Sequence, residues 1–194
     1  RPANMRYVTG GYRGEGCVFV AKGASVIITD FRYTEQAQRE ALRQLASAPS
    51  VTQDGHSIRL YANIAGTDDL PLLQESGAEG VGLLRSEFLY LGRSTYPTED
   101  ELFESYKTIV QAMDGREVII RTLDIGADKQ VGYFDMPPED NPALGLRAIR
   151  LCLTRPILFQ TQLCAILRAS RYGNVGVMFP MVTGPDELHR LKQA

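Results

Sequence analysis

Short apolar runs alternate with helical patterns along most of this 194-residue chain. Four runs are typical of buried strands, and they cover residues 58–64, 80–85, 117–124 and 174–182. A segment with helical spacing or helix-end signals follows each run, at residues 68–76, 97–113, 143–172 and 185–192. Strands that alternate with helices form parallel sheets, because a crossover must carry the chain back before the next strand. We therefore predict an α/β fold, and the pattern alone fits both a doubly wound sheet and a (β/α)8 barrel.

Two helices in this region carry clear end signals. Thr98 can cap the helix at 97–113, Glu101 completes a capping box, and Gly115 closes the helix. Pro156 lies inside the long helical pattern at 143–172, and we expect the helix to break there.

The first fifty residues have a different character. Two β-branched runs around a Gly turn predict a hairpin at 17–29, and helical spacing follows at 34–46. A linker at 46–50 then predicts two domains, residues 1–50 and residues 51–194. The chain starts without an initiator Met, so we expect it to begin inside a longer reading frame.

Composition limits the possible partners and surroundings of the chain. A net charge of −2 and a pI near 5.8 give no reason to expect nucleic acid. No apolar run approaches the roughly 18 residues that span a bilayer, so we expect a soluble chain with no membrane insertion. Cys152 and Cys164 lie in helical apolar patterns, which predicts buried thiols in a reducing cytoplasm. Neither His56 nor His189 has metal-ligand spacing to another candidate.

Polar side chains gather where the predicted strands end. Arg85 ends the second strand, while Arg121 and Asp124, then Asp128 and Lys129, follow along the third. This edge of a parallel sheet is where α/β proteins build their sites. Two arginines converging there suit a phosphate or a carboxylate, because guanidinium groups donate in a fork. An equally weighted alternative is that each arginine pairs with a nearby carboxylate, such as Glu87 or Asp124.

Two weaker signals add cations to this edge. Residues 126–129, Gly-Ala-Asp-Lys, resemble a phosphate loop, although they lack the Walker pattern. Arg147 and Arg150 lie on a predicted helix opening at 141–150, where they and the helix N-terminus could hold an anion. A solvated basic face is equally plausible for Arg150.

Five motifs in order resemble enzyme I of the bacterial sugar phosphotransferase system, the phosphoenolpyruvate–protein phosphotransferase family. They are GLLRSEFLY at 82–90, RTLDIGADK at 121–129, NPALGLRAIR at 141–150, the helix segment 162–170, and MFPM at 178–181. The likeness covers residues 56–194. Pyruvate phosphate dikinase and phosphoenolpyruvate synthase share the barrel, but their third-strand motif differs.

The resemblance implies the first half of a (β/α)8 barrel, with about four β/α units, that binds phosphoenolpyruvate and Mg²⁺ at its C-terminal face. That family moves the phosphoryl group of phosphoenolpyruvate to a protein histidine in cytoplasmic sugar uptake, with a phosphocarrier protein as partner. Residues matching Arg85 and Arg121 hold the phosphoryl group there, and those matching Lys129 and Arg147 line the anion site. Separately, four strands leave open parallel edges, and we expect these edges to drive self-association into a homodimer or larger species.

The family's remaining machinery has no counterpart in this sequence. Its Mg²⁺ carboxylates, a further arginine and the cysteine acid lie on later strands, and its phosphorylated histidine lies in another domain. We therefore expect no catalytic residue and no metal ligand here, and no complete reaction. Ser86 and Ala127 replace the usual Thr and Gly, and Ala127 would be strained if that position required a positive φ.

Residues 1–45 resemble a different family, the N-terminal domain of Xaa-Pro aminopeptidases and prolidases. The likeness rests on NMRYVTG at 4–10 and TDFRYTEQA at 29–37. That family's metal ligands lie in a C-terminal domain, so no peptidase activity is implied. Two alternatives to a phosphotransferase stay open: a non-catalytic half-barrel for binding or assembly, and a proline-peptidase N-terminal fragment.

Overall fold

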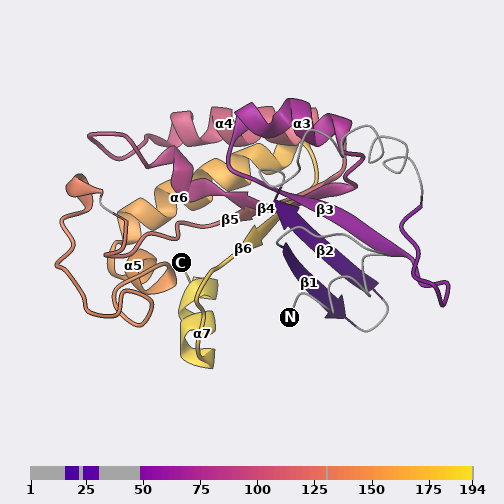
Figure 1. The fold of residues 1–194 in the computed structure, drawn as a ribbon. Helices are drawn as coiled ribbons and strands as arrows, with labels where there is room; N and C mark the ends of the chain where they lie inside the picture. The colour runs from indigo at the N-terminus through magenta and orange to yellow at the C-terminus, as the bar shows by residue number, and fades with distance from the viewer. Residues whose placement is uncertain (1–15, 22–23, 31–48, 130, 194) are drawn as a thin grey trace.

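The computed structural model describes residues 16–21, 24–30, 49–129 and 131–193. Their strands form one six-stranded sheet in which spatial order follows chain order (Figure 1). The strands are β1 (Gly16–Ala21), β2 (Ala24–Asp30), β3 (Ile58–Ile64), β4 (Gly80–Arg85), β5 (Glu117–Arg121) and β6 (Val175–Met178).

The strands from β3 to β6 are parallel to one another, so the predicted α/β fold with a four-stranded parallel sheet is confirmed. β2 also pairs in parallel with β3, while β1 pairs with β2 in the antiparallel sense. β5 and β6 are shorter than predicted. After β5 the Thr122 N–H still donates to the Met178 carbonyl, whereas the Leu123 N–H donates to the Gln162 side chain.

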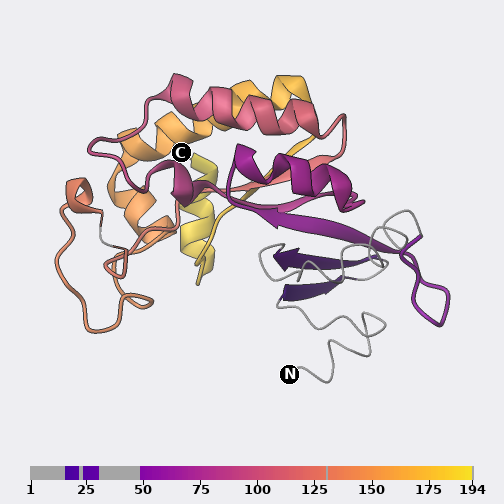
Figure 2. The same ribbon diagram turned by 45° about the horizontal axis from the view of Figure 1, so that its top comes forward.

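Helices cover one face of this sheet. In Figures 1 and 2, α3, α4 and α6 lie together on the same side of the strands. The helices are α3 (Leu70–Glu75), α4 (Glu99–Ala112), α5 (Ile149–Thr154), α6 (Pro156–Ala169) and α7 (Pro185–Gln193). Short 3-10 turns are η3 (Thr67–Asp69), η4 (Ser86–Leu89), η5 (Gly132–Phe134) and η6 (Ser170–Tyr172). Among the described residues, no helix has both the length and the apolar character needed to cross a bilayer.

The predicted capping box of α4 is confirmed. The Thr98 side chain accepts from the Glu101 N–H, and the Glu101 carboxylate accepts from the Thr98 N–H at 2.7 Å. The helix break predicted at Pro156 is also confirmed, because α5 ends at Thr154 and α6 begins at Pro156. The predicted helix at 34–46 lies outside the described residues.

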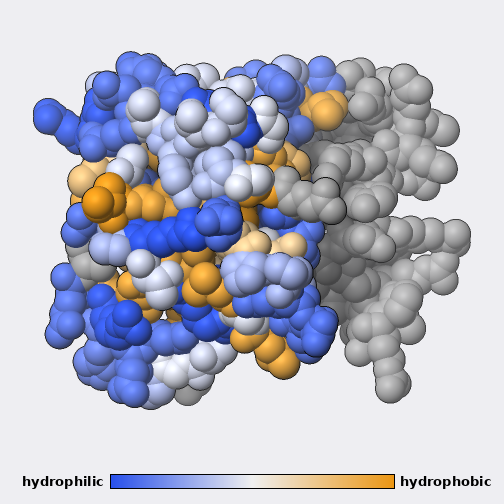
Figure 3. Space-filling view, turned by 90° about the vertical axis from the view of Figure 1, so that its left-hand side faces the viewer, coloured by the Kyte–Doolittle hydropathy of each residue, from blue (hydrophilic) through white to orange (hydrophobic). Residues whose placement is uncertain are grey.

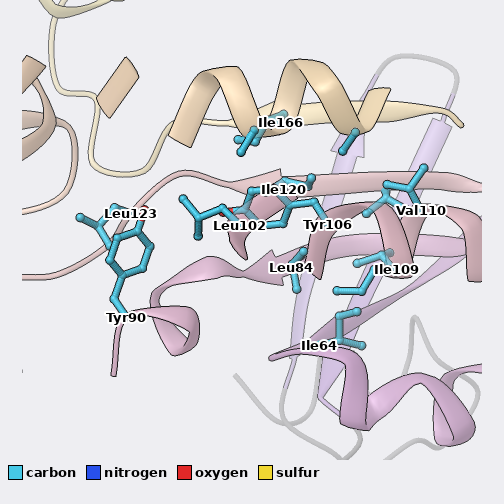
Figure 4. Packing of buried hydrophobic residues seen from close by; sticks show 14 of the residues in the cluster. Ile64, Leu84, Tyr90, Leu102, Tyr106, Ile109, Val110, Ile120, Leu123 and Ile166 are labelled. Carbon is cyan, nitrogen blue, oxygen red and sulfur yellow. The ribbon is translucent and has the colours of Figure 1, made fainter. Parts of the chain in front are cut away.

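The core fills the space between the sheet and its helices. Figure 4 shows Tyr106 and Ile109 of α4 beside Leu84 and Ile120 of the sheet, with Ile166 of α6 near Ile120. All five side chains are buried. Burial of large apolar side chains is the main stabilising contribution to such a fold, about 1.5–3 kcal/mol for each.

Two expectations about the third β/α unit were wrong. Residues 143–148 are not helical, because Ala148 has φ 51° and ψ −122°, which a right-handed helix cannot contain. Cys152 is buried, but Cys164 is exposed, since α6 turns residues 162, 165, 166 and 169 inward and Cys164 away from them.

Apolar side chains also reach the surface. Figure 3 shows apolar patches between hydrophilic residues on the side of the molecule where α5 lies. Leu144 and Ile157 are 78% and 81% exposed.

Candidate functional site

Two arginines lie next to each other at the C-terminal edge of the sheet. Arg85 is the last residue of β4 and Arg121 the last of β5, and the two are register partners in the parallel pairing. Both side chains are partly buried. The structure thus brings together the two arginines that the sequence placed at this edge.

Arg121 contacts two carboxylates. Its Nη2 donates to Glu87 Oε1 at 2.5 Å, and its Nη1 lies 3.3 Å from Asp124 Oδ2. Glu87 lies in η4, directly after β4, and is only 3% exposed. The alternative raised from the sequence, arginine–carboxylate pairing, is therefore present for Arg121.

Lys129 and Arg147 reach the same carboxylates from later segments. Lys129 Nζ donates to the Asp124 carbonyl at 2.7 Å and lies 3.4 Å from Glu87 Oε1. Arg147 Nε donates to Asp124 Oδ1 at 2.8 Å, and its Nη1 donates to an Asp128 oxygen at 3.0 Å. Arg121, Lys129 and Arg147 are thereby joined into one cluster through Glu87 and Asp124.

Arg85 and Arg150 have other contacts. The Arg85 guanidinium lies over the Phe88 ring, with Cζ 4.7 Å from the ring centroid. Arg150 donates to the carbonyls of Gly145 and Ala143, at 2.7 Å in each case. Arg150 thus holds the loop that carries Arg147, a role that the sequence did not indicate.

The contact between Asp124 and Arg147 favours the charged form of both side chains. Burial raises the pKa of the Asp124 carboxyl, but the Arg147 hydrogen bond and the charges of Arg121, Arg147 and Lys129 lower this pKa below its ordinary value. The same hydrogen bond raises the pKa of Arg147. Three cations, Arg121, Lys129 and Arg147, contact the carboxylates of Glu87, Asp124 and Asp128, and Arg85 lies at the end of the neighbouring strand.

Some polar atoms in this cluster have unused hydrogen-bonding capacity. Arg121 Nε, Glu87 Oε2 and Thr122 Oγ1 are buried and have no hydrogen-bond partner. Buried polar groups are normally satisfied by protein, water or ligand. The site can therefore accept a further polar group beside Arg121.

A buried polar network lies beneath the cluster, and sequence reasoning missed it. Gln162 of α6 bonds to the Leu123 N–H, to Ser86 Oγ and to Tyr106 OH. One signal was available: Gln162 occupies a position of α6 where the helical period places an apolar residue, between Phe159 and Ile166.

Backbone strain occurs in this region, although not at Ala127. Ala127 is not among the described non-glycine residues with positive φ, so the strain considered there does not arise. Ala148, next to Arg147, has φ 51° and is fully buried. Non-glycine residues in such conformations persist where the surroundings hold them, often at functional sites.

The described residues do not fit the Mg²⁺ that the resemblance implies. They contain no group of three or more His, Cys, Asp or Glu side chains that could hold a metal ion. Glu87, Asp124 and Asp128 are each engaged by arginine or lysine. We therefore derive no chemical step through a metal.

The fold and the site together define an α/β protein with arginine, lysine and carboxylate side chains clustered at one edge of its parallel sheet. The sequence model of the family described as "PEP-utilising enzyme, PEP-binding domain" matches residues 39–194, and the chain belongs to this family.

Proteins named phosphoenolpyruvate-protein phosphotransferase are among its relatives. The Staphylococcus carnosus protein is 53% identical over 154 residues, which are 79% of this chain and 27% of the relative. The Bacillus subtilis protein is 51% identical over 156 residues, 80% of this chain and 27% of the relative. The Staphylococcus aureus MSSA476 protein is 46% identical over 185 residues, 95% of this chain and 32% of the relative. The chain thus spans about a third or less of these relatives.

The Staphylococcus aureus match bears on the first segment. Because it covers 95% of the chain, it includes most of residues 1–45, which resemble the aminopeptidase N-terminal domain. The likeness to phosphotransferases therefore extends into that segment.

Proposed function

We propose that this chain forms the phosphoryl-binding part of a phosphoenolpyruvate site, in an enzyme that moves the phosphoryl group to a protein histidine during sugar uptake. The observation that carries the proposal is the register pairing of Arg85 with Arg121 at the site edge. The relatives' name, phosphoenolpyruvate-protein phosphotransferase, supports phosphoenolpyruvate as the donor and a protein as the acceptor.

The cluster suits a phosphoryl group for a physical reason. Phosphoryl transfer needs positioning and neutralisation of the equatorial oxygens, which forked arginines and a lysine supply. Arg85 and Arg121 would hold the group, while Lys129 and Arg147 would add positive charge. Glu87 and Asp124 occupy donors of Arg121, so the incoming phosphoryl group would exchange with these internal carboxylates.

The sheet is also part of this proposal. Four parallel strands with α3, α4 and α6 on one face are consistent with about half of a (β/α)8 barrel. Residues 51–194 would be the barrel portion, preceded by a small hairpin and helix. The boundary at residue 50 stays a prediction, and limited proteolysis that releases a stable fragment beginning near it would support it.

The complete enzyme would need more than this chain. Relatives extend far beyond it, and the Mg²⁺ and phosphocarrier partner of the family would act with those further parts. We propose that the whole protein works in the cytoplasm, forms a homodimer, and that this chain alone binds phosphoenolpyruvate without turning it over.

Titration of the folded chain with phosphoenolpyruvate and inorganic phosphate, followed by NMR of arginine side chains, tests this function. Saturable shifts are expected, and Arg85→Lys or Arg121→Lys should weaken binding strongly because the fork is lost. Arg171→Lys, an exposed arginine on η6, is the matched control. No saturation in a folded sample, or an equal loss in the control, would contradict the proposal. Pyruvate release above background would show that the chain is catalytically competent.

A further inference from the structure

Gln162 is a buried polar side chain on the apolar face of α6. It is 1% exposed, and its neighbours at helical spacing, Phe159 and Ile166, are buried apolar residues. Burying an amide is costly unless its groups are hydrogen-bonded. An apolar residue would fill this position without that cost, so packing alone does not account for glutamine.

The Gln162 amide is bonded to both strand ends of the site. Its Oε1 accepts from the Leu123 N–H at 2.9 Å, two residues after Arg121. Its Nε2 donates to Ser86 Oγ at 2.9 Å, one residue after Arg85. Ser86 Oγ in turn donates to the Arg121 carbonyl at 2.6 Å. One side chain therefore joins the end of β4 to the end of β5.

The strand ladder gives less support here than in a regular sheet. The pairing of β4 with β5 shifts register between Val81 and Leu84, just before the two arginines. The ladder ends with the pairs Leu84–Ile120 and Arg85–Arg121. Beyond Arg121, the Thr122 N–H donates to the Met178 carbonyl of β6, whereas the Leu123 N–H donates to the Gln162 side chain. Beyond the Arg85–Arg121 pair, the side chains of Gln162 and Ser86 join the two strand ends.

We propose that Gln162 is a positioning residue, which sets the spacing of Arg85 and Arg121 and the placement of Asp124 so that one phosphoryl group meets both guanidinium groups. Gln162 acts through Ser86 and Leu123 and does not touch the ligand. That the ligand is a phosphoryl group rests on the proposed function above. The role of Gln162 in setting the spacing of Arg85 and Arg121 and the placement of Asp124 does not.

The test compares two substitutions on the same helix. Gln162→Met keeps length and volume but removes all three hydrogen bonds. Ile166→Val trims the same buried face and leaves those bonds in place. Each variant is made in the full chain, and melting temperature and circular dichroism establish that it is folded.

Two readouts are taken at a temperature where both variants are folded. The first is the pKa of the Asp124 carboxyl by NMR titration, which needs no ligand. It should rise toward the ordinary aspartate value in Gln162→Met and stay as in the parent in Ile166→Val. The second is the Kd for inorganic phosphate and for phosphoenolpyruvate. Gln162→Met should weaken both by about tenfold, since small displacements of paired groups are costly to a preorganised site.

Ser86→Ala is a milder variant that keeps the test decisive if Gln162→Met does not fold. It removes the Ser86 hydroxyl, which accepts from Gln162 and donates to the Arg121 carbonyl. It should change the Asp124 pKa and the Kd values in the same direction as Gln162→Met. In the double variant the effects should not add, because both substitutions break one network.

The outcomes separate the two claims. If the parent chain binds neither ligand, the proposed function fails, and the Asp124 pKa still decides the geometric claim. If the parent binds and the Gln162 and Ser86 variants match Ile166→Val in both readouts, the positioning role is wrong and Gln162 serves stability alone.

Discussion

Arg121 donates to Glu87 Oε1 at 2.5 Å through Nη2, while its Nη1 lies 3.3 Å from Asp124 Oδ2. Both terminal nitrogens of the guanidinium are thus oriented by internal carboxylates. Such pairing holds Arg121 in place, and it also means that an external anion competes with Glu87 and Asp124. We therefore expect the proposed phosphate binding to depend on these acids as well as on the arginines.

Removing the Glu87 charge should strengthen phosphate binding. Glu87→Gln keeps the size of the side chain but weakens its hold on Arg121 and Lys129. Because a hydrogen bond to a charged group contributes about 1.5–3 kcal/mol, we expect about tenfold tighter binding of phosphate at low salt. We also expect a loss of about 1–3 kcal/mol in the free energy of unfolding. Calorimetric titration and denaturant unfolding measure the two effects.

The control for this substitution is Glu104→Gln. Glu104 is an exposed acid on α4 that pairs with Lys107 at 3.1 Å, outside the site. Glu104→Gln changes the net charge by the same amount as Glu87→Gln, so equal gains in phosphate affinity for both variants would point to a general charge effect. A weaker Glu87→Gln site would mean that Glu87 serves mainly to orient Arg121.

Asp124 should make stability depend on acid pH. Its pKa is lower in the folded chain than its ordinary value, so its ionised form contributes stability that is present above the unfolded pKa, about 3.9. That contribution is lost as the pH falls through the lower folded pKa. The melting temperature should therefore drop between about pH 5 and pH 2, and the drop should be shallower in Asp124→Asn. Parallel profiles for parent and variant would show that Asp124 is not linked to folding.

The sequence predicted the frame of the site for reasons that can be located in particular residues. Arg85 and Arg121 could be placed together because parallel strands end at one edge, and their register pairing follows from that rule. Thr98 and Glu101 marked a helix start because a capping box is local in sequence. Both inferences need only a short stretch of chain or a general rule of topology.

Other features depended on partners far away in the chain. Gln162 and Ser86 are 76 residues apart, and no periodicity shows that a glutamine bonds across that distance. Arg147 and Arg150 look alike in sequence, yet one reaches Asp124 and the other holds backbone carbonyls. The difference arises at Ala148, whose positive φ ends the loop and could not be read from an alanine.

Replacing Ala148 should expose the strain in that loop. Ala148 has φ 51°, a conformation that glycine adopts freely and alanine does not. Strain of this kind costs about 1–3 kcal/mol, and part of its relief is offset by the greater freedom of glycine in the unfolded chain. We expect Ala148→Gly to raise the free energy of unfolding by up to about 1 kcal/mol, measured by denaturant titration.

Ala165→Gly is the matched control for Ala148. Ala165 is equally buried but lies within α6, where glycine is unfavourable, so this variant should lose about 1 kcal/mol. The two identical substitutions are thus expected to change stability in opposite directions. A loss of similar size at both positions would contradict strain at Ala148.

The β6 edge should drive self-association of this chain. β6 is the last strand in the sheet order, so within the described residues its outer edge pairs with no strand, and Val177 on it is 38% exposed. An unpaired edge with an apolar side chain is a template for pairing with another chain, and a lysine on such an edge opposes it. We expect dimers or larger species in light scattering at high concentration, and a shift toward the 21.5 kDa monomer in Val177→Lys. Thr108→Lys is the control for this substitution. Thr108 lies on the exposed surface of α4, so the variant adds the same charge away from the edge and should leave the distribution of oligomeric species unchanged. A sharp monomer peak for the parent chain would rule out edge-driven association, and an equal response to both lysines would assign the effect to net charge.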